Sequence, residues 1–168
     1  QAKIVFNEAL NMFKQSPELR KLLKKRKSDL YFPHTMSVFE PLGRNYDSLD
    51  GLNASFAIID EAHALKGTQG LKLYEVIKQS QSSRKNPLLI TITTSGSVID
   101  GIYDQLYEYS SKICDGIIKD ETFLPIMYEL DNKDEWRNPK NWMKANPGLG
   151  VIKKEEDIKE KCERVKSD

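Results

Sequence analysis

The chain has 168 residues, 39% of them hydrophobic and 30% charged, and its formal net charge is +1. This composition excludes a disordered chain and is typical of a globular domain with a core of its own. No apolar run approaches the ~20 residues that span a bilayer, so we expect no membrane contact and a cytoplasmic location. With so small a net charge, any contact to nucleic acid requires a local basic patch.

The first part of the chain predicts two helices and a hairpin. Apolar residues at helical spacing predict a helix over residues 2–15. Ser16 and Pro17 then fit the N-cap and first position of a second helix. Its basic run "RKLLKKRK" fits either a solvated helix face, which we favour, or a contact to DNA phosphates. "DLYF" and "MSVF" predict a hairpin around Pro33. Because the chain opens in helical rhythm without an initiator methionine, we expect a piece of a longer protein.

The middle of the chain predicts a strand–helix–strand unit. "FAII" at 56–59 and "LLITI" at 88–92 are continuous apolar runs, which are typical of strands covered on both faces. A helix is expected between them, from about residue 71 to 79. Strands that alternate with helices in this way predict an α/β fold with a parallel sheet.

The last part of the chain is less regular. After a helix expected at about 98–113, "FLPIMYEL" at 123–130 predicts a third strand, and Pro125 places it at a sheet edge or a bulge. The stretch "EWRNPKNWMKANPGLG" is expected to be irregular with short helices. Residues 154–166 predict a charged terminal helix.

Polar residues follow both strands of the middle unit. Two adjacent carboxylates, Asp60 and Glu61, come directly after the first strand. Three hydroxyl residues and a glycine follow the second strand, namely Thr93, Thr94, Ser95 and Gly96. Ligands of open α/β sheets bind at the carboxyl ends of the strands, so we expect both groups on one rim.

The two neighbouring carboxylates suit a metal-bound nucleotide. Each raises the pKa of the other, so such a pair persists where a cation compensates it. One carboxylate and substrate phosphates can hold Mg²⁺, while the second deprotonates an attacking water. Four apolar residues followed by Asp60 and Glu61 therefore predict a Walker B box. The alternative for the two acids is that they only cap the next helix, which would stabilise it by ~0.3–1 kcal/mol. The alternative for the hydroxyl residues is that they only form a turn. The spacing of both motifs favours the nucleotide site.

The segments "NASFAIIDEAHAL" and "SSRKNPLLITITTSG" resemble the large terminase subunit of tailed bacteriophages, the motor ATPase that packages DNA into the prohead. "SLDGLN", "KIVFNEALNMFKQSPEL" and "WMKANPGLG" are also similar to that family, so the resemblance spans nearly the whole chain. It implies that Asp60 is the magnesium ligand and Glu61 the catalytic base. It further implies a coupling motif that links ATP hydrolysis to movement, made of Thr93, Thr94, Ser95 and Gly96.

The resemblance also implies the fold and the partners of the parent protein. The fold would be the parallel sheet of a P-loop NTPase of the ASCE or RecA-like type. The partners would be double-stranded DNA, the small terminase subunit, the portal and prohead, and further copies of the chain in a homo-oligomeric motor. The motor would work in the cytoplasm of a host bacterium, as part of a phage or prophage.

Two features of the family are missing from these residues. The chain contains neither a G-x-x-x-x-G-K-[ST] phosphate loop nor a nuclease domain. We expect the loop upstream and the nuclease downstream, so the sheet would be incomplete by truncation. Residues 1–130 would then be the later part of the ATPase domain, and 131–168 the region leading to the nuclease. The isolated chain would hydrolyse ATP negligibly. The strand at 88–92 would have an unpaired edge.

Two alternative functions remain open at this point. "DEAH" is the signature of a class of superfamily 2 helicases, but the coupling motif here is "TTSG" and no "TPGR"-like motif occurs in residues 1–55. A DNA-binding domain with a degenerate, non-enzymatic nucleotide fold is the second alternative. Three further residues are weaker candidates. His63 fits a relay of the site's state or an ordinary first-turn histidine, and Arg44 or Arg84 fits an arginine finger.

Overall fold

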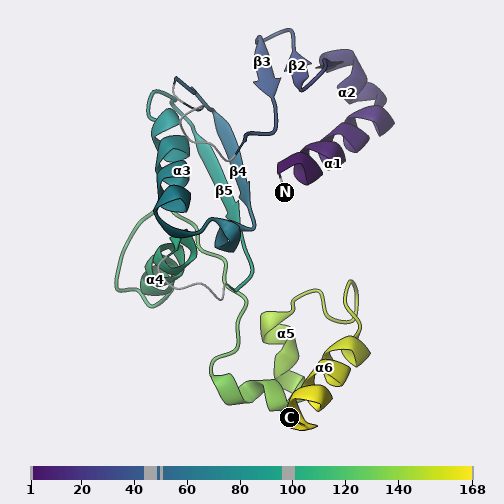
Figure 1. The fold of residues 1–168 in the computed structure, drawn as a ribbon, viewed down its shortest axis with the longest axis vertical. Coiled ribbons are helices and arrows are strands. Elements are labelled where there is room, and N and C mark those ends of the chain that lie inside the picture. The colour runs from purple at the N-terminus through teal and green to yellow at the C-terminus, as the bar shows by residue number, and fades with distance from the viewer. Residues whose placement is uncertain (1, 44–48, 50, 96–100, 168) are drawn as a thin grey trace. The chain divides into compact units, whose positions relative to one another are not determined.

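The structure is a computed structural model that describes the chain except residues 1, 44–48, 50, 96–100 and 168 (Figure 1). It divides into two compact units, Gln1–Glu108 and Tyr109–Asp168, which we describe separately. No helix in the described ranges is both long and apolar enough to cross a membrane. The boundary expected at residue 130, between the later part of the ATPase domain and the region leading to the nuclease, stays a prediction.

The first unit begins with the two predicted helices. Helix α1 covers Ala2–Gln15 and α2 covers Pro17–Leu22. The hydroxyl of Ser16 accepts a hydrogen bond from the amide of Leu19 at 3.2 Å, so Ser16 is the predicted N-cap. The expectation of a longer basic helix is wrong, because α2 ends at Leu22.

A three-stranded antiparallel sheet follows α2. Its strands β1 (Lys24–Lys25), β2 (Leu30–Phe32) and β3 (Ser37–Phe39) are arranged in that order. The hairpin predicted around Pro33 is confirmed as β2 and β3. Strand β1 was not predicted. Leu23 leaves the helix with extended dihedral angles, φ −114° and ψ 152°, and the lysines after it pair with β2.

The strand–helix–strand prediction is confirmed. Strands β4 (Phe56–Asp60) and β5 (Leu88–Ile92) pair in parallel, with Asp60 opposite Ile92. Helix α3 (Gly67–Ser80) connects them and lies along the two strands in Figure 1, and α4 (Ile102–Cys114) follows β5. The parallel sheet with its covering helices is consistent with a P-loop type of fold.

One face of this small sheet packs into a core, whereas four apolar side chains of the other face are exposed among the described residues. Side chains alternate between the two faces of a strand, and one face packs into the core. The buried core residues are Leu49, Ile59, Ala62, Leu73, Ile77 and Ile102. On the other face Phe56, Leu88, Ile90 and Ile92 are 43%, 52%, 37% and 55% exposed. The expectation that both strands are covered on both faces is therefore wrong for the described residues.

The second unit has a small core of its own. Short helical segments at Lys133–Arg137, Pro139–Asn141 and Trp142–Ala145 (η3, η4, α5) precede α6, Glu155–Ser167. Trp142, Leu149 and Ile158 are buried together. The indole N–H of Trp142 donates to the carbonyl of Trp136 at 2.6 Å, which ties the segments together. The predicted irregular region and terminal helix are thus confirmed.

The third strand predicted at 123–130 does not form. This segment has no regular secondary structure, and among the described residues the parallel sheet consists of β4 and β5. Leu124, Ile126 and Tyr128 are instead exposed. A strand requires a hydrogen-bonded neighbour, and the described residues provide none for this segment.

We predict that Gly70→Ala destabilises the protein by about 1–3 kcal/mol, the usual cost of overpacking. A Cβ at Gly70 would lie 2.5 Å from the backbone carbon and oxygen of Leu65, which cannot yield as a flexible side chain can. This clash outweighs the better helix propensity of alanine, up to ~1 kcal/mol. Urea unfolding measures the change. Gly43→Ala is the control, since nothing lies within 4 Å of its added methyl group. Equal stability of Gly70→Ala and the original chain would contradict the packing described.

Candidate active site

The backbone turns sharply where β4 ends. Glu61 has left-handed dihedral angles, φ 56° and ψ 54°, which non-glycine residues adopt at a cost of about 1–3 kcal/mol. The following residues Ala62–Ala64 form a short 3₁₀ turn, η2, and Ala62 is fully buried in the core. Burial of Ala62 thus holds the turn and leaves the side chain of Glu61 at the strand end.

Thr93 joins the ends of the two strands. Its hydroxyl oxygen accepts a hydrogen bond from the backbone amide of His63 at 3.1 Å and lies 3.2 Å from the Nδ1 atom of His63. The same hydroxyl donates to the carbonyl of Thr94 at 2.9 Å. One side chain therefore connects segments 30 residues apart in sequence.

Glu61 belongs to the same group of contacts. Its Oε2 atom lies 3.0 Å from Nδ1 of His63 and accepts a hydrogen bond of 3.5 Å from the hydroxyl of Thr94. A carboxylate only accepts, so we assign the hydrogen of this contact to Nδ1. The side chains of Glu61 and His63 are 35% and 30% exposed, so water reaches them. We call Glu61, His63, Thr93 and Thr94 the strand-end cluster.

Asp60 lies beside the cluster and is the last residue of β4. Its carboxylate makes no hydrogen bond or ion pair within the described ranges, so its oxygens are available to a ligand. Those ranges hold no group of three or more acidic, histidine or cysteine side chains suited to a metal. A single free carboxylate instead fits Mg²⁺, which keeps water and phosphate oxygens as most of its ligands.

The other predicted site residues are not part of the cluster. Ser95 is exposed, and Gly96 and Arg44 lie outside the described residues. The guanidinium of Arg84 donates to the carbonyl of Asn53 at 2.7 Å, at the opposite end of the strands from Glu61. The structure thus brings Glu61 together with the hydroxyl residues Thr93 and Thr94, and leaves Arg84 apart.

The structure adds the contacts of His63 and one supporting residue that the sequence did not indicate. From the sequence, His63 fits a relay or an ordinary first-turn histidine; in the structure it lies in η2 and contacts both Glu61 and Thr93. Gln81 was not singled out, yet it is 5% exposed and its amide donates to the carbonyl of Leu88 at 3.0 Å. This bond anchors the start of β5. A polar residue straight after an amphipathic helix was the only hint in the sequence.

Comparison with known proteins identifies the family. Residues 1–112 match the profile of the family described as "Terminase large subunit, ATPase domain". The chain is 30% identical over 174 aligned residues to the terminase large subunit of Lactococcus phage p2, covering 100% of this chain and 31% of that protein. It is 26% identical to the large subunit of Enterobacteria phage HK97, with 98% of this chain and 32% of that protein covered.

A solved structure is similar as well. The crystal structure of the HK97 bacteriophage large terminase matches with a TM-score of 0.81 and 26% identity, over 100% of this chain and 34% of that one. The chain therefore spans about a third of the length of the relatives it matches. These matches agree with the motifs at the strand ends, and the chain belongs to the family of terminase large subunit ATPase domains.

Proposed function

We propose that the chain carries the water-activating part of a phage DNA-packaging ATPase. Family membership and the strand-end cluster support this proposal. In the proposed motor, hydrolysis of ATP moves double-stranded DNA into a prohead within the host bacterium. Further copies of the chain, the small terminase subunit and the portal would complete the machine. Membership of the terminase family favours DNA packaging over the strand separation of a helicase.

Asp60 is the proposed link to the metal. Its carboxylate is free of partners in the described part of the chain and stands at the carboxyl end of β4, where ligands of such sheets bind. When bound with ATP, Mg²⁺ neutralises charge on the phosphate oxygens. Asp60 would hold that ion directly or through water. The phosphate loop expected upstream would hold the nucleotide, so the isolated 168 residues are proposed to hydrolyse ATP negligibly.

Glu61 is the proposed general base. A base must lie within hydrogen-bond reach of the water it deprotonates and must be oriented toward it. The hydrogen bond from Thr94 and the contact with His63 fix one oxygen of the carboxylate. The other oxygen has no partner in the described ranges and is proposed to accept the proton of the attacking water.

Thr93 and His63 are the proposed positioning residues. The Thr93 hydroxyl holds the backbone and side chain of His63, and His63 holds Glu61. A shift at the end of β5 would therefore move the general base. This chain of contacts is a physical route by which the coupling motif would relate hydrolysis to movement of DNA.

We predict that Glu61→Gln in the full-length protein lowers kcat for ATP hydrolysis by about 10²–10⁴-fold, the usual contribution of a general base. The amide keeps the size of the side chain but cannot accept the proton, so ATP binding is expected to persist. Steady-state hydrolysis and nucleotide binding measure the two effects. Glu75→Gln is the control, because Glu75 is exposed on α3. Normal turnover by Glu61→Gln would reject the assignment.

A second prediction concerns the positioning residues. Thr93→Val keeps the shape of the side chain and removes its hydroxyl, which costs about 0.5–1.5 kcal/mol per hydrogen bond. For Thr93→Val we expect kcat to fall roughly 3–10-fold with little change in KM. The kcat of the double variant with His63→Ala should be little lower than that of either single variant. Kinetics of the full-length protein measure this cycle. Thr91→Val is the control, since Thr91 lies opposite Ile59 on the helix-covered face. Strictly additive losses would show that Thr93 and His63 act independently.

A further inference from the structure

The N-terminal module, residues 2–39, carries an excess of positive charge. Seven basic residues and one acidic residue lie between Lys14 and Lys27, whereas the whole chain has a net charge of only +1. All seven basic side chains are exposed. The charge of this chain is therefore balanced overall but strongly uneven along it.

Most of these cations have no acidic partner. Arg26 pairs with Asp29 at 2.6 Å, and its hydrogen bond lowers the pKa of the Asp29 carboxyl. The ammonium of Lys25 donates to the backbone carbonyls of Arg26 and Lys27. The remaining five side chains make no ion pair or hydrogen bond in the described ranges, namely Lys14, Arg20, Lys21, Lys24 and Lys27.

Cations of the second unit are paired more often, which shows that the contrast is local. Lys144 contacts Asp131 at 2.5 Å and Glu135 at 3.0 Å. Arg137 and Arg164 likewise have acidic partners on neighbouring turns. Five lysines of the second unit also have no ion pair among the described residues, namely Lys133, Lys140, Lys154, Lys159 and Lys161. The N-terminal module differs in that its unpaired cations follow one another closely along α2, β1 and the residues beside them.

The strand register assigns these residues to two faces of the sheet. Lys25, Leu30 and Phe39 are opposite one another and face Phe6 of α1, whose ring lies 5.9 Å from that of Phe39. Lys24 is opposite Tyr31, and Tyr31 is opposite the exposed Val38, so these three lie on the other face.

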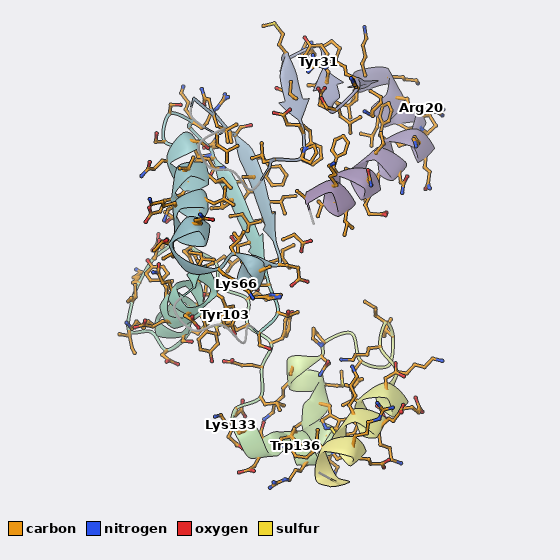
Figure 2. The ribbon with its side chains drawn as sticks, in the orientation of Figure 1. Arg20, Tyr31, Lys66, Tyr103, Lys133 and Trp136 are labelled. Carbon is orange, nitrogen blue, oxygen red and sulfur yellow. The ribbon has the colours of Figure 1, made fainter. Side chains whose placement is uncertain are left out.

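That second face combines charged side chains with the half-buried Tyr31 and the exposed Val38. The guanidinium of Arg26 lies 4.5 Å from the ring centre of Tyr31. We call Lys24, Arg26, Tyr31 and Val38 the outer face. Lys21 of α2 lines a surface pocket together with Phe32, Pro33 and His34, so the helix adjoins the hairpin at its turn and not at the outer face, because Phe32 shares the face of Leu30. Figure 2 shows Arg20 on α2 and Tyr31 on the sheet of this module.

We propose that the outer face, together with the free cations of α2 and of the residues that flank it, binds the phosphate backbone of double-stranded DNA. Neighbouring like charges without partners repel one another, and a dense row of phosphates relieves that repulsion. Lysine ammonium groups are point charges suited to phosphates and carry no base specificity. The positive charge of the surface is observed directly. The choice of DNA as the polyanion that it binds rests on the proposed function.

The test measures binding of full-length protein to a fluorescent DNA duplex at several salt concentrations, without nucleotide. The triple variant Lys21→Gln, Lys24→Gln and Lys27→Gln removes three free cations and spares the structural contacts of Lys25 and Arg26. Each phosphate contact contributes about 0.9 to the slope of log K against log salt. We expect the magnitude of the slope to fall by roughly 3, with affinity weakened equally for duplexes of different sequence. The corresponding Lys→Arg triple variant should restore binding.

A matched control removes the same charge elsewhere. Lys154, Lys159 and Lys161 are exposed at or beside the acid-rich helix α6, and their replacement by glutamine should leave the slope unchanged. An unchanged slope for the first triple variant, or an equal change for the control, would overturn the proposal. Glu61→Gln should bind DNA normally. If the proposed ATPase function is wrong but the DNA-binding proposal is right, DNA binding will still depend on the three lysines, while ATP hydrolysis will not depend on Glu61.

Discussion

The parallel register of β4 with β5 is the constraint on which the candidate site depends. It sets Asp60 opposite Ile92, so the residues that follow the two strands emerge at the same edge of the sheet. The hydroxyl of Thr93 can then reach the backbone and ring of His63, and His63 can reach Glu61. A shift of the register by one residue would turn these side chains to the other face and separate the contacts.

The proposed catalytic and DNA-binding surfaces depend on different physical forces. The strand-end cluster is held by hydrogen bonds of 2.9–3.5 Å and by the left-handed backbone of Glu61, which precedes the buried Ala62. Such contacts are hardly sensitive to salt. The basic outer face acts through exposed charges, whose effect salt screens over about 10 Å at 0.1 M. Ionic strength should therefore separate the two proposed activities in the full-length protein.

Much of the fold could be predicted because apolar spacing and the order of strands and helices can be read from short stretches of sequence. The carboxyl ends of parallel strands lie at one edge of a sheet, and this rule correctly grouped Glu61 with Thr93. Other features depend on partners distant in sequence. The left-handed turn at Glu61 follows from burial of the residue after it. Strand β1 consists of two lysines without an apolar pattern, and it exists because β2 lies beside it. The apolar residues 123–130 match a strand pattern, but no neighbour pairs with them in the described ranges.

The acids at the end of β4 are proposed to bind the metal and face the phosphates of ATP. A structure of the full-length protein with Mg²⁺ and a non-hydrolysable ATP analogue tests it most directly. We expect the Asp60 carboxylate to coordinate the ion at about 2.1 Å or through one water, with Glu61 facing the terminal phosphate. A nucleotide bound with its metal and terminal phosphate away from both Asp60 and Glu61 would contradict the account.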